Sequence, residues 1–354
     1  MTEILAKIAG IKYTPFLCKE LNVFPIKEIS KALSKDATFI IETENKKQIA
    51  ISWWVSAKRT RSYPYTRVYD SLNFSGKKVT VIPIIKDEGF EGDRDFLQWD
   101  TISLMSLLGV YVIISYYKDA VQSAMYDNKI TNQRFDIELI KSEIKRLLSY
   151  QSDALHWNLE QINKVGEIGQ KALTAYEKIS VKLNVKVHSK ESAEKRIKEL
   201  LKGKDNFMNL SRDLAQKAQH RESITIQPKE NVEGEKATIT IKNYLGGFYY
   251  FTCDEVIIEN EQLLIIEAKH SKEKNLPSLG DIKDGLLKMI LFTNLEDVKI
   301  NGKKYSPLPI LKLTAETHFE INQLSQSEQK MLKLLEKEAK TNKFKIKVND
   351  LFLI

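Results

Sequence analysis

The sequence predicts an α/β protein of the α+β kind, with a C-terminal α/β domain, an N-terminal α+β domain and a helical region between them. Its 354 residues are more than one hydrophobic core usually serves. Hydrophobic residues make up 42% and charged residues 29%, which is a globular composition. Strand-like runs dominate the two ends, and helical periodicity dominates the middle. We therefore expect domains at residues 1–120, 121–204 and 205–354.

In the N-terminal region, β-branched and aromatic runs predict strands, and the polar loop from Lys86 to Gly89 ends one of them. The expected strands are 38–41, 48–55, 79–85 and 110–117, the last buried on both faces. Helical spacing at 100–108 predicts a helix, with Asp100 or Thr101 as its N-cap.

The middle of the chain has the 3.6-residue periodicity of amphipathic helices. The expected helices are 135–148, 151–183, 192–201 and 206–219. Gly166 and Gly169 are candidate breaks within the second, because glycine weakens a helix interior.

After residue 220 the pattern changes to strands, then a helix, then another strand. The expected strands are 223–226, 237–241, 247–252, 263–268 and 308–313. The expected helices are 281–292 and 327–341, with Ser327 as the N-cap of the latter, and 344–354 is a strand-like tail.

The charge balance is basic, with 55 Lys and Arg against 47 Asp and Glu, a net charge of +8 and a pI near 9.0. A basic surplus favours polyanionic partners. The two cysteines, Cys18 and Cys253, form no CxxC pair, so we expect neither structural zinc nor a disulfide framework. No apolar run is long enough for a signal peptide or a membrane span, so we expect a soluble, cytoplasmic protein.

The segment that carries chemistry runs from Cys253 to Lys269, where two apolar strands flank the polar turn 259–262. A hairpin there brings Asp254, expected to begin one strand, next to Glu267, expected to close the other. Glu267 and Lys269 are two residues apart and share a strand face. Two carboxylates and one ammonium group should therefore converge.

This set suits phosphodiester hydrolysis. Carboxylate and carbonyl oxygens are ligands that Mg²⁺ prefers, so we expect Asp254, Glu267 and the carbonyl of Ala268 to bind it. Lys269 would orient or deprotonate the attacking water and offset the developing charge.

Asp254, twelve intervening residues and then Glu267-Ala268-Lys269 resemble the motif of the PD-(D/E)xK nuclease superfamily. Cys253 stands in place of the proline, which bears no chemistry. Residues 205–315 resemble that superfamily's αβββαβ core, the restriction-endonuclease-like fold, with 206–219 as its first helix. The resemblance implies a type II restriction endonuclease that acts on double-stranded DNA with Mg²⁺ as a homodimer.

Other segments are candidate DNA contacts. Residues 53–69 interleave bases with aromatics, which suits base reading and stacking. The side chains we expect to contact DNA there are Lys58, Arg59, Arg61, Tyr63, Tyr65 and Arg67. An ordinary basic loop beside core aromatics is the alternative. Lys283 is a further candidate, because it lies with Asp281, Asp284 and Lys288 on the helix after the motif.

Three further features of the sequence have simpler explanations than a second catalytic site. The acidic segment 88–100 suits a recognition loop or a capping network better than another metal site, because no acid-x-Lys strand follows it. The basic region 186–221 is either a phosphate-contacting or an ordinary solvated face. His270 is most simply incidental to the site.

The sequence leaves two other functions open. One is a repair or mobile-element nuclease with the same core. The other is a nucleic-acid-binding protein without catalysis, in which the acid cluster is incidental.

Overall fold

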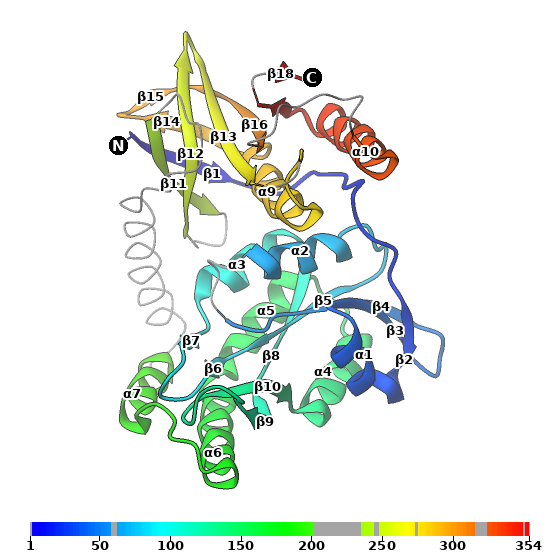
Figure 1. The fold of residues 1–354 in the computed structure, drawn as a ribbon, viewed down its shortest axis with the longest axis vertical. Helices are drawn as coiled ribbons and strands as arrows, with labels where there is room; N and C mark the ends of the chain where they lie inside the picture. Colours follow the sequence, from blue (N-terminus) through cyan, green and yellow to red (C-terminus); the bar gives the residue numbers. More distant parts are fainter. Residues whose placement is uncertain are drawn as a thin grey trace. The chain divides into compact units, whose positions relative to one another are not determined.

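The computed structural model describes residues 2–57, 62–201, 235–243, 248–272, 275–315, 324–349 and 351–353. The fold mixes helices with several β-sheets, as the sequence predicts (Figure 1). The chain divides into two compact units: one joins Met1–Lys19 to Arg212–Ile354, and the other is Glu20–Ser211. Within the described ranges, no helix is both long enough and apolar enough to cross a membrane.

The first unit is built on one mixed sheet, which comprises nine strands over the described residues, in the order β15-β14-β1-β11-β12-β13-β16-β17-β18. Its strands are β1 (Thr2–Ile8), β11 (Glu235–Asn243), β12 (Phe248–Glu259), β13 (Gln262–Ser271), β14 (Glu296–Ile300), β15 (Lys303–Lys304), β16 (Ser306–Ala315), β17 (Lys345–Val348) and β18 (Leu351–Phe352). β11, β12 and β13 form an antiparallel meander, and β16 pairs parallel to β13. Only Tyr305 separates β15 from β16 in the chain, so the sheet must curl to bring its β15 edge near the start of β16.

Among the described residues, two helices accompany this sheet, α9 (Leu279–Phe292) and α10 (Gln326–Asn342) (Figure 1). α9 connects β13 to the later strands and packs on the sheet face that carries Leu311. Ser278 caps α9 by accepting a hydrogen bond from the Asp281 N–H. Ser325, not the expected Ser327, caps α10, because Ser325 and Glu328 have the spacing of a reciprocal capping box.

The strands around the motif are longer than the sequence predicts. β12 continues without a break from Phe248 to Glu259, so Asp254 lies inside a strand rather than at its beginning. β13 continues to Ser271, so Glu267 does not close its strand. The expected breaks are absent because the ladders between these strands and their neighbours continue past both positions.

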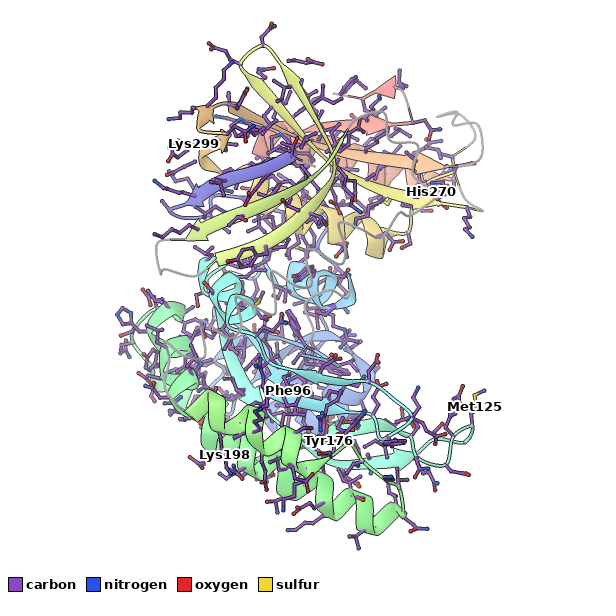
Figure 2. The ribbon with its side chains drawn as sticks, turned by 90° about the vertical axis from the view of Figure 1, so that its left-hand side faces the viewer. Phe96, Met125, Tyr176, Lys198, His270 and Lys299 are labelled. Atoms are coloured by element: carbon purple, nitrogen blue, oxygen red, sulfur yellow. The ribbon has the colours of Figure 1, made fainter. Side chains whose placement is uncertain are left out.

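The second unit contains a five-stranded sheet in the order β2-β3-β4-β5-β8. Its strands are β2 (Val23–Pro25), β3 (Thr38–Glu42), β4 (Gln48–Trp53), β5 (Lys78–Pro83) and β8 (Val110–Ser115). The smaller pairs are β6 (Ile85–Asp87) with β7 (Arg94–Phe96), and β9 (Tyr117–Gln122) with β10 (Ile130–Phe135). β8 is buried almost throughout, as its apolar sequence predicts. Met125 projects from the tip of the β9–β10 hairpin, whereas Tyr176 points into the interior (Figure 2).

The helices of the second unit follow the predicted periodicity, with differences at their ends. They are η1 (Ile26–Glu28), α1 (Ile29–Lys35), α2 (Ser62–Ser71), α3 (Trp99–Leu107), α4 (Ile137–Ser149), α5 (Ala154–Asn163), α6 (Val165–Leu183) and α7 (Lys190–Leu201). Gln98, not Asp100 or Thr101, precedes α3. The break between α5 and α6 falls at Lys164 and not at a glycine. Gly169 stays helical inside α6, where Ile197 of α7 packs against it.

The two units divide the chain differently from the three expected regions. β1 pairs with β11 and β14, which places the first residues with the C-terminal part of the chain. The helical region belongs with residues 20–120, because α5 packs on β8 through Trp157 and Asn158. The expected helix 206–219 and strand 223–226 lie outside the described residues.

Candidate active site

Asp254 and Glu267 lie on adjacent positions of the β12–β13 hairpin. The β12–β13 ladder ends with the pair Glu255–Ile266, one position before Asp254 and Glu267. The β11–β12 ladder shifts register between Cys253 and Val256, so Asp254 lies at an irregular point of β12. Oδ2 of Asp254 accepts a hydrogen bond from the Ala268 N–H at 2.7 Å, which fixes this carboxylate against β13.

Lys269 joins the two acids from the same strand face. Its Nζ lies 2.9 Å from Oε1 of Glu267, as the two-residue spacing predicts. The same ammonium lies 2.6 Å from Oδ2 of Asp284, a buried residue of α9. Lys269 is therefore held between a strand carboxylate and a helix carboxylate.

Lys288 is a second cation at the site and is not among the site residues expected from the sequence. Its Nζ lies 2.7 Å from Oε2 of Glu267 and 3.3 Å from the Thr252 carbonyl oxygen. Asp284 and Lys288 are four residues apart, the spacing that places two side chains on one helix face. That spacing, next to a predicted acidic strand, was the signal that could have identified the pair.

A glycine lets α9 approach the sheet this closely. A Cβ built on Gly285 would lie 2.7 Å from Cδ1 of Leu311 and 3.4 Å from Cε of Lys269. The first distance is too short for unshifted packing. The missing side chain at Gly285 therefore makes room for Leu311 and for the aliphatic part of Lys269 directly beneath α9.

The site is strongly coupled electrostatically, because Glu267 is 1% exposed. Burial by itself would raise the pKa of Glu267, but the nearby Lys269 and Lys288 ammonium groups outweigh it and lower the pKa below its usual value. Burial likewise opposes the charge on Lys269, yet Glu267 and Asp284 raise the pKa of this lysine above its usual value. In this arrangement the two carboxylates favour the protonated, cationic form of Lys269.

Three other reactive side chains near the site are buried, hydrogen-bonded or ion-paired. Burial raises the pKa of the Cys253 thiol, so this group stays protonated and is a poor nucleophile. His270, at the far end of β13 (Figure 2), has Nδ1 3.0 Å from Oγ1 of Thr314. Lys312 lies 3.8 Å from Glu255, on the sheet face opposite Glu267.

The expected DNA contacts are only partly described. Lys58, Arg59 and Arg61 lie outside the described residues, and of Tyr63 only the backbone, in α2, is described. Arg67 donates to the Trp53 carbonyl at 2.8 Å and stacks over the Trp53 ring at 4.2 Å, which secures α2 against β4.

Two of the expected DNA contacts are corrected by their burial. Tyr65 is 5% exposed and packs edge-on against Trp54, so it belongs to the core aromatics that the sequence left as an alternative. Lys283 is 3% exposed, because it lies on the buried side of α9. As they lie, neither side chain presents its polar group to DNA.

The acidic segment 88–100 lies within a network of ion pairs in the second unit. Glu88 pairs with Lys86, and Asp95 accepts a hydrogen bond from the Ser56 hydroxyl. Just before the segment, Asp87 contacts His188 Nδ1 at 2.8 Å and accepts from the Gly89 N–H at 2.9 Å. These contacts join β6 and its loop to the chain that enters α7, which is a structural role.

The basic region 186–221 is described only as far as residue 201. Within the described part, Lys190 forms ion pairs with Glu177 and Glu194, so its positive charge is neutralised by acids of the same unit. Among the residues whose side chains are described, no group of three or more His, Cys, Asp and Glu is placed to hold a metal. The expected ligand set has two carboxylates and a backbone carbonyl. Because it contains only two such side chains, the absence of a group of three does not bear on it.

Comparison with known proteins identifies no family. No family model matches the chain, and no curated protein matches it. Among solved structures, it is compared with the adenylation, ketoreductase and pseudo-Asub multidomain structure of a keto acid-selecting NRPS module, at 11% identity. That alignment covers 99% of this chain and 25% of the other, with a TM-score of 0.14, so the chain spans a quarter of that protein. A score this low carries no argument about fold or function.

Proposed function

We propose that the chain is a Mg²⁺-dependent, sequence-specific endodeoxyribonuclease of the type II restriction kind, which hydrolyses phosphodiester bonds in double-stranded DNA. One observation carries the proposal. Asp254 contacts β13 at the Ala268 N–H, next to Glu267 and Lys269, and Glu267 is buried between two ammonium groups. Buried charges are costly, so a cluster of this kind is a functional candidate.

The order of the elements supports the same proposal. An antiparallel meander of β11, β12 and β13 is followed by α9, by the short strands β14 and β15, and then by β16, which is parallel to β13. Apart from the two short strands, this order is the one expected for the βββαβ part of the core that the resemblance implies. The first helix of that core, expected at 206–219, falls in a part of the chain that the structure does not describe.

The donor set fits magnesium. Asp254 and Glu267 offer hard oxygen ligands on adjacent strands. The Ala268 N–H points to Asp254, and a strand residue sends its carbonyl to the same edge as its N–H, so this oxygen also leaves β13 on the Asp254 side. When bound, Mg²⁺ would supply Lewis-acid stabilisation of the charge that develops on the phosphate.

The chain's own residues would supply the remaining chemistry. Lys269 is a protonated donor, so it would orient the attacking water and offset negative charge on the phosphate. Asp284 would hold the Lys269 side chain in place, since the two groups are 2.6 Å apart. Lys58, Arg59, Arg61 and Tyr63 stay proposed DNA contacts, and the charge of +8 favours such a partner. Cutting both strands would use two copies of the site in a symmetric homodimer.

The test is digestion of several phage genomes by the purified protein with Mg²⁺, followed by sequencing of the ends. We expect cuts at one short palindromic sequence, and we expect Lys269→Ala to slow cutting by about a hundredfold or more. Asp254→Ala and Glu267→Gln should behave alike, whereas Lys272→Ala, an exposed lysine three residues further on, should cut normally.

The outcomes separate the alternatives. Cutting confined to forks or flaps would favour a repair or mobile-element enzyme. DNA binding without cutting of any sequence would leave the protein as a non-catalytic DNA-binding protein. If Lys269→Ala and Asp254→Ala both cut as fast as the unmodified protein, the catalytic site lies elsewhere.

A further inference from the structure

Lys288 has a position that the catalytic proposal does not use. It comes from α9, yet its ammonium lies against Glu267 Oε2 at 2.7 Å and against the Thr252 carbonyl at 3.3 Å. Thr252 is two residues before Asp254 in β12. The ammonium thus bridges Glu267 to the strand that carries the second acid.

Lys288 differs from Lys269 in its partners. Lys269 has two carboxylates, Glu267 and Asp284, and would stay paired if it lost one of them. Lys288 contacts one carboxylate among the described residues, that of Glu267. It is therefore the ammonium that another cation can replace at Glu267 without breaking the contact between β13 and α9 made by Lys269 and Asp284.

The charges of the cluster favour such an exchange. Asp254, Glu267 and Asp284 carry three negative charges, and Lys269 and Lys288 carry two positive ones. Removing Lys288 takes one positive charge from this cluster, where low solvent exposure strengthens the attraction between carboxylates and a cation.

We propose that the Lys288 ammonium pairs with the Glu267 carboxylate in the metal-free protein and is displaced when a divalent metal ion binds to Asp254 and Glu267. The inference rests on the proposed magnesium site and deepens it. Metal and Lys288 compete for the same carboxylate oxygen, so the free protein binds the metal more weakly than its ligands alone would allow. The Lys288 ammonium, once displaced, becomes available to an anionic group such as a phosphate.

The test measures Mn²⁺ binding to the full-length protein in the absence of DNA, by isothermal titration calorimetry and by electron paramagnetic resonance of free Mn²⁺. We expect Lys288→Met and Lys288→Gln to bind Mn²⁺ about tenfold more tightly than the unmodified protein, because a competing charge is removed. Lys288→Arg keeps the charge and should stay weak. The glutamine variant serves if the methionine variant does not fold, and thermal unfolding monitors both.

Two controls locate the effect. Lys312→Met removes another buried lysine, which pairs with Glu255 on the opposite face of the sheet, and should leave Mn²⁺ affinity unchanged. Adding Glu267→Gln to Lys288→Met should abolish the gain.

The result that would overturn the inference is a folded Lys288→Met or Lys288→Gln protein that binds Mn²⁺ no more tightly than the unmodified chain. A gain that persists without the Glu267 carboxylate would overturn it as well. A gain that depends on Glu267 supports the inference whether or not the protein cuts DNA. Failure of the nuclease proposal is thus seen separately, in the digestion experiment.

Discussion

At the residue scale, Glu267 shows how the site holds charge in its interior. The carboxylate is 1% exposed, and each of its oxygens meets an ammonium group, from Lys269 or from Lys288. Burying an unpaired carboxylate would be strongly unfavourable, but pairing with hydrogen-bonding cations offsets the cost. The charged forms of Glu267, Lys269 and Lys288 therefore stabilise one another.

This dependence predicts how stability responds to acid. The folded-state pKa of Glu267 is lowered, so the stability it contributes is present above the unfolded value of about 4.3 and is lost as pH falls through the folded pKa. The pKa values of Lys269 and Lys288 are raised, so their contributions are full below about 10.4 and are lost only as pH rises through the folded values.

We therefore expect Glu267→Gln to make thermal stability less dependent on pH below about 4.3 than in the unmodified protein. Differential scanning calorimetry across this range measures it. Asp297→Asn, in the same unit, removes a half-buried acid that pairs with Lys7 and Lys299, and should change the acid response less. Equal acid slopes for Glu267→Gln and the unmodified protein would contradict the pairing.

At the element scale, α9 determines whether the site forms. The helix brings Asp284 and Lys288 to the sheet, and Gly285 permits the close packing against Leu311. A helix interior normally disfavours glycine, so its presence here indicates a packing requirement.

Gly285→Ala should lower the free energy of unfolding by about 1–3 kcal/mol, since the added Cβ would press against Leu311 Cδ1 of β16. Urea unfolding measures the change. The matched control is Gly280→Ala on the same helix, where a Cβ would meet only Ser278 Oγ at an ordinary 3.6 Å. Stability that is the same for both alanine variants would show that the contact at Gly285 is relaxed at little cost.

A second element-scale feature lies in the other unit, where β8 ends the five-stranded sheet. Side chains of α5 take the place of a further strand. Asn158 accepts from the Val112 N–H at 2.7 Å and donates to the Val110 carbonyl at 3.0 Å, and Trp157 donates to the Val112 carbonyl at 2.7 Å. These contacts satisfy an edge that would otherwise be open to pairing with another chain.

Asn158→Ala should destabilise the second unit by about 1–3 kcal/mol, because it leaves buried backbone groups of β8 without partners. Thermal unfolding followed by circular dichroism measures the loss, and light scattering measures any association through the edge. Asn163→Ala, an exposed position at the end of the same helix, should change neither quantity. A neutral Asn158→Ala would indicate that other groups replace the amide.

At the scale of the whole molecule, the first unit is assembled from two distant parts of the chain. β1 lies inside the sheet, parallel to β11 and antiparallel to β14. The residues after β1 are also fixed to this unit, because the buried carboxylate of Glu338 accepts from the Tyr13 hydroxyl and from the Phe16 N–H, both at 2.7 Å. The unit that carries the candidate site therefore needs the N-terminal residues.

Deleting residues 2–8 should prevent stable folding of this unit, since both neighbours of β1 would lose a partner strand. Deleting residues 351–353, which form the short terminal strand β18, should be tolerated. Hydrogen exchange of β11 and β12 amides distinguishes the two variants. Protection of those amides that survives loss of residues 2–8 would show that the sheet does not depend on β1.

The local features of the candidate site were predictable from the sequence. Alternation of period two placed Glu267 and Lys269 on one face, and the polar turn between apolar runs predicted the hairpin that brings Asp254 beside them. Asp284 and Lys288 were seen on the following helix, but their contacts were not predicted, because they depend on how α9 packs. The expected DNA contacts Tyr65 and Lys283 were misplaced because an amphipathic pattern does not tell which polar side chain is covered by a neighbouring element.

The sequence by itself determined the mixed α and β class, most of the helices and strands, and the meeting of the three motif residues, because each depends on residues close together in the chain. Only the tertiary structure decided that residues 2–8 pair with residues 237–243 and that Lys288 contacts Glu267. Such contacts depend on which distant surfaces fit together once apolar faces are buried, and short-range periodicity does not carry that information.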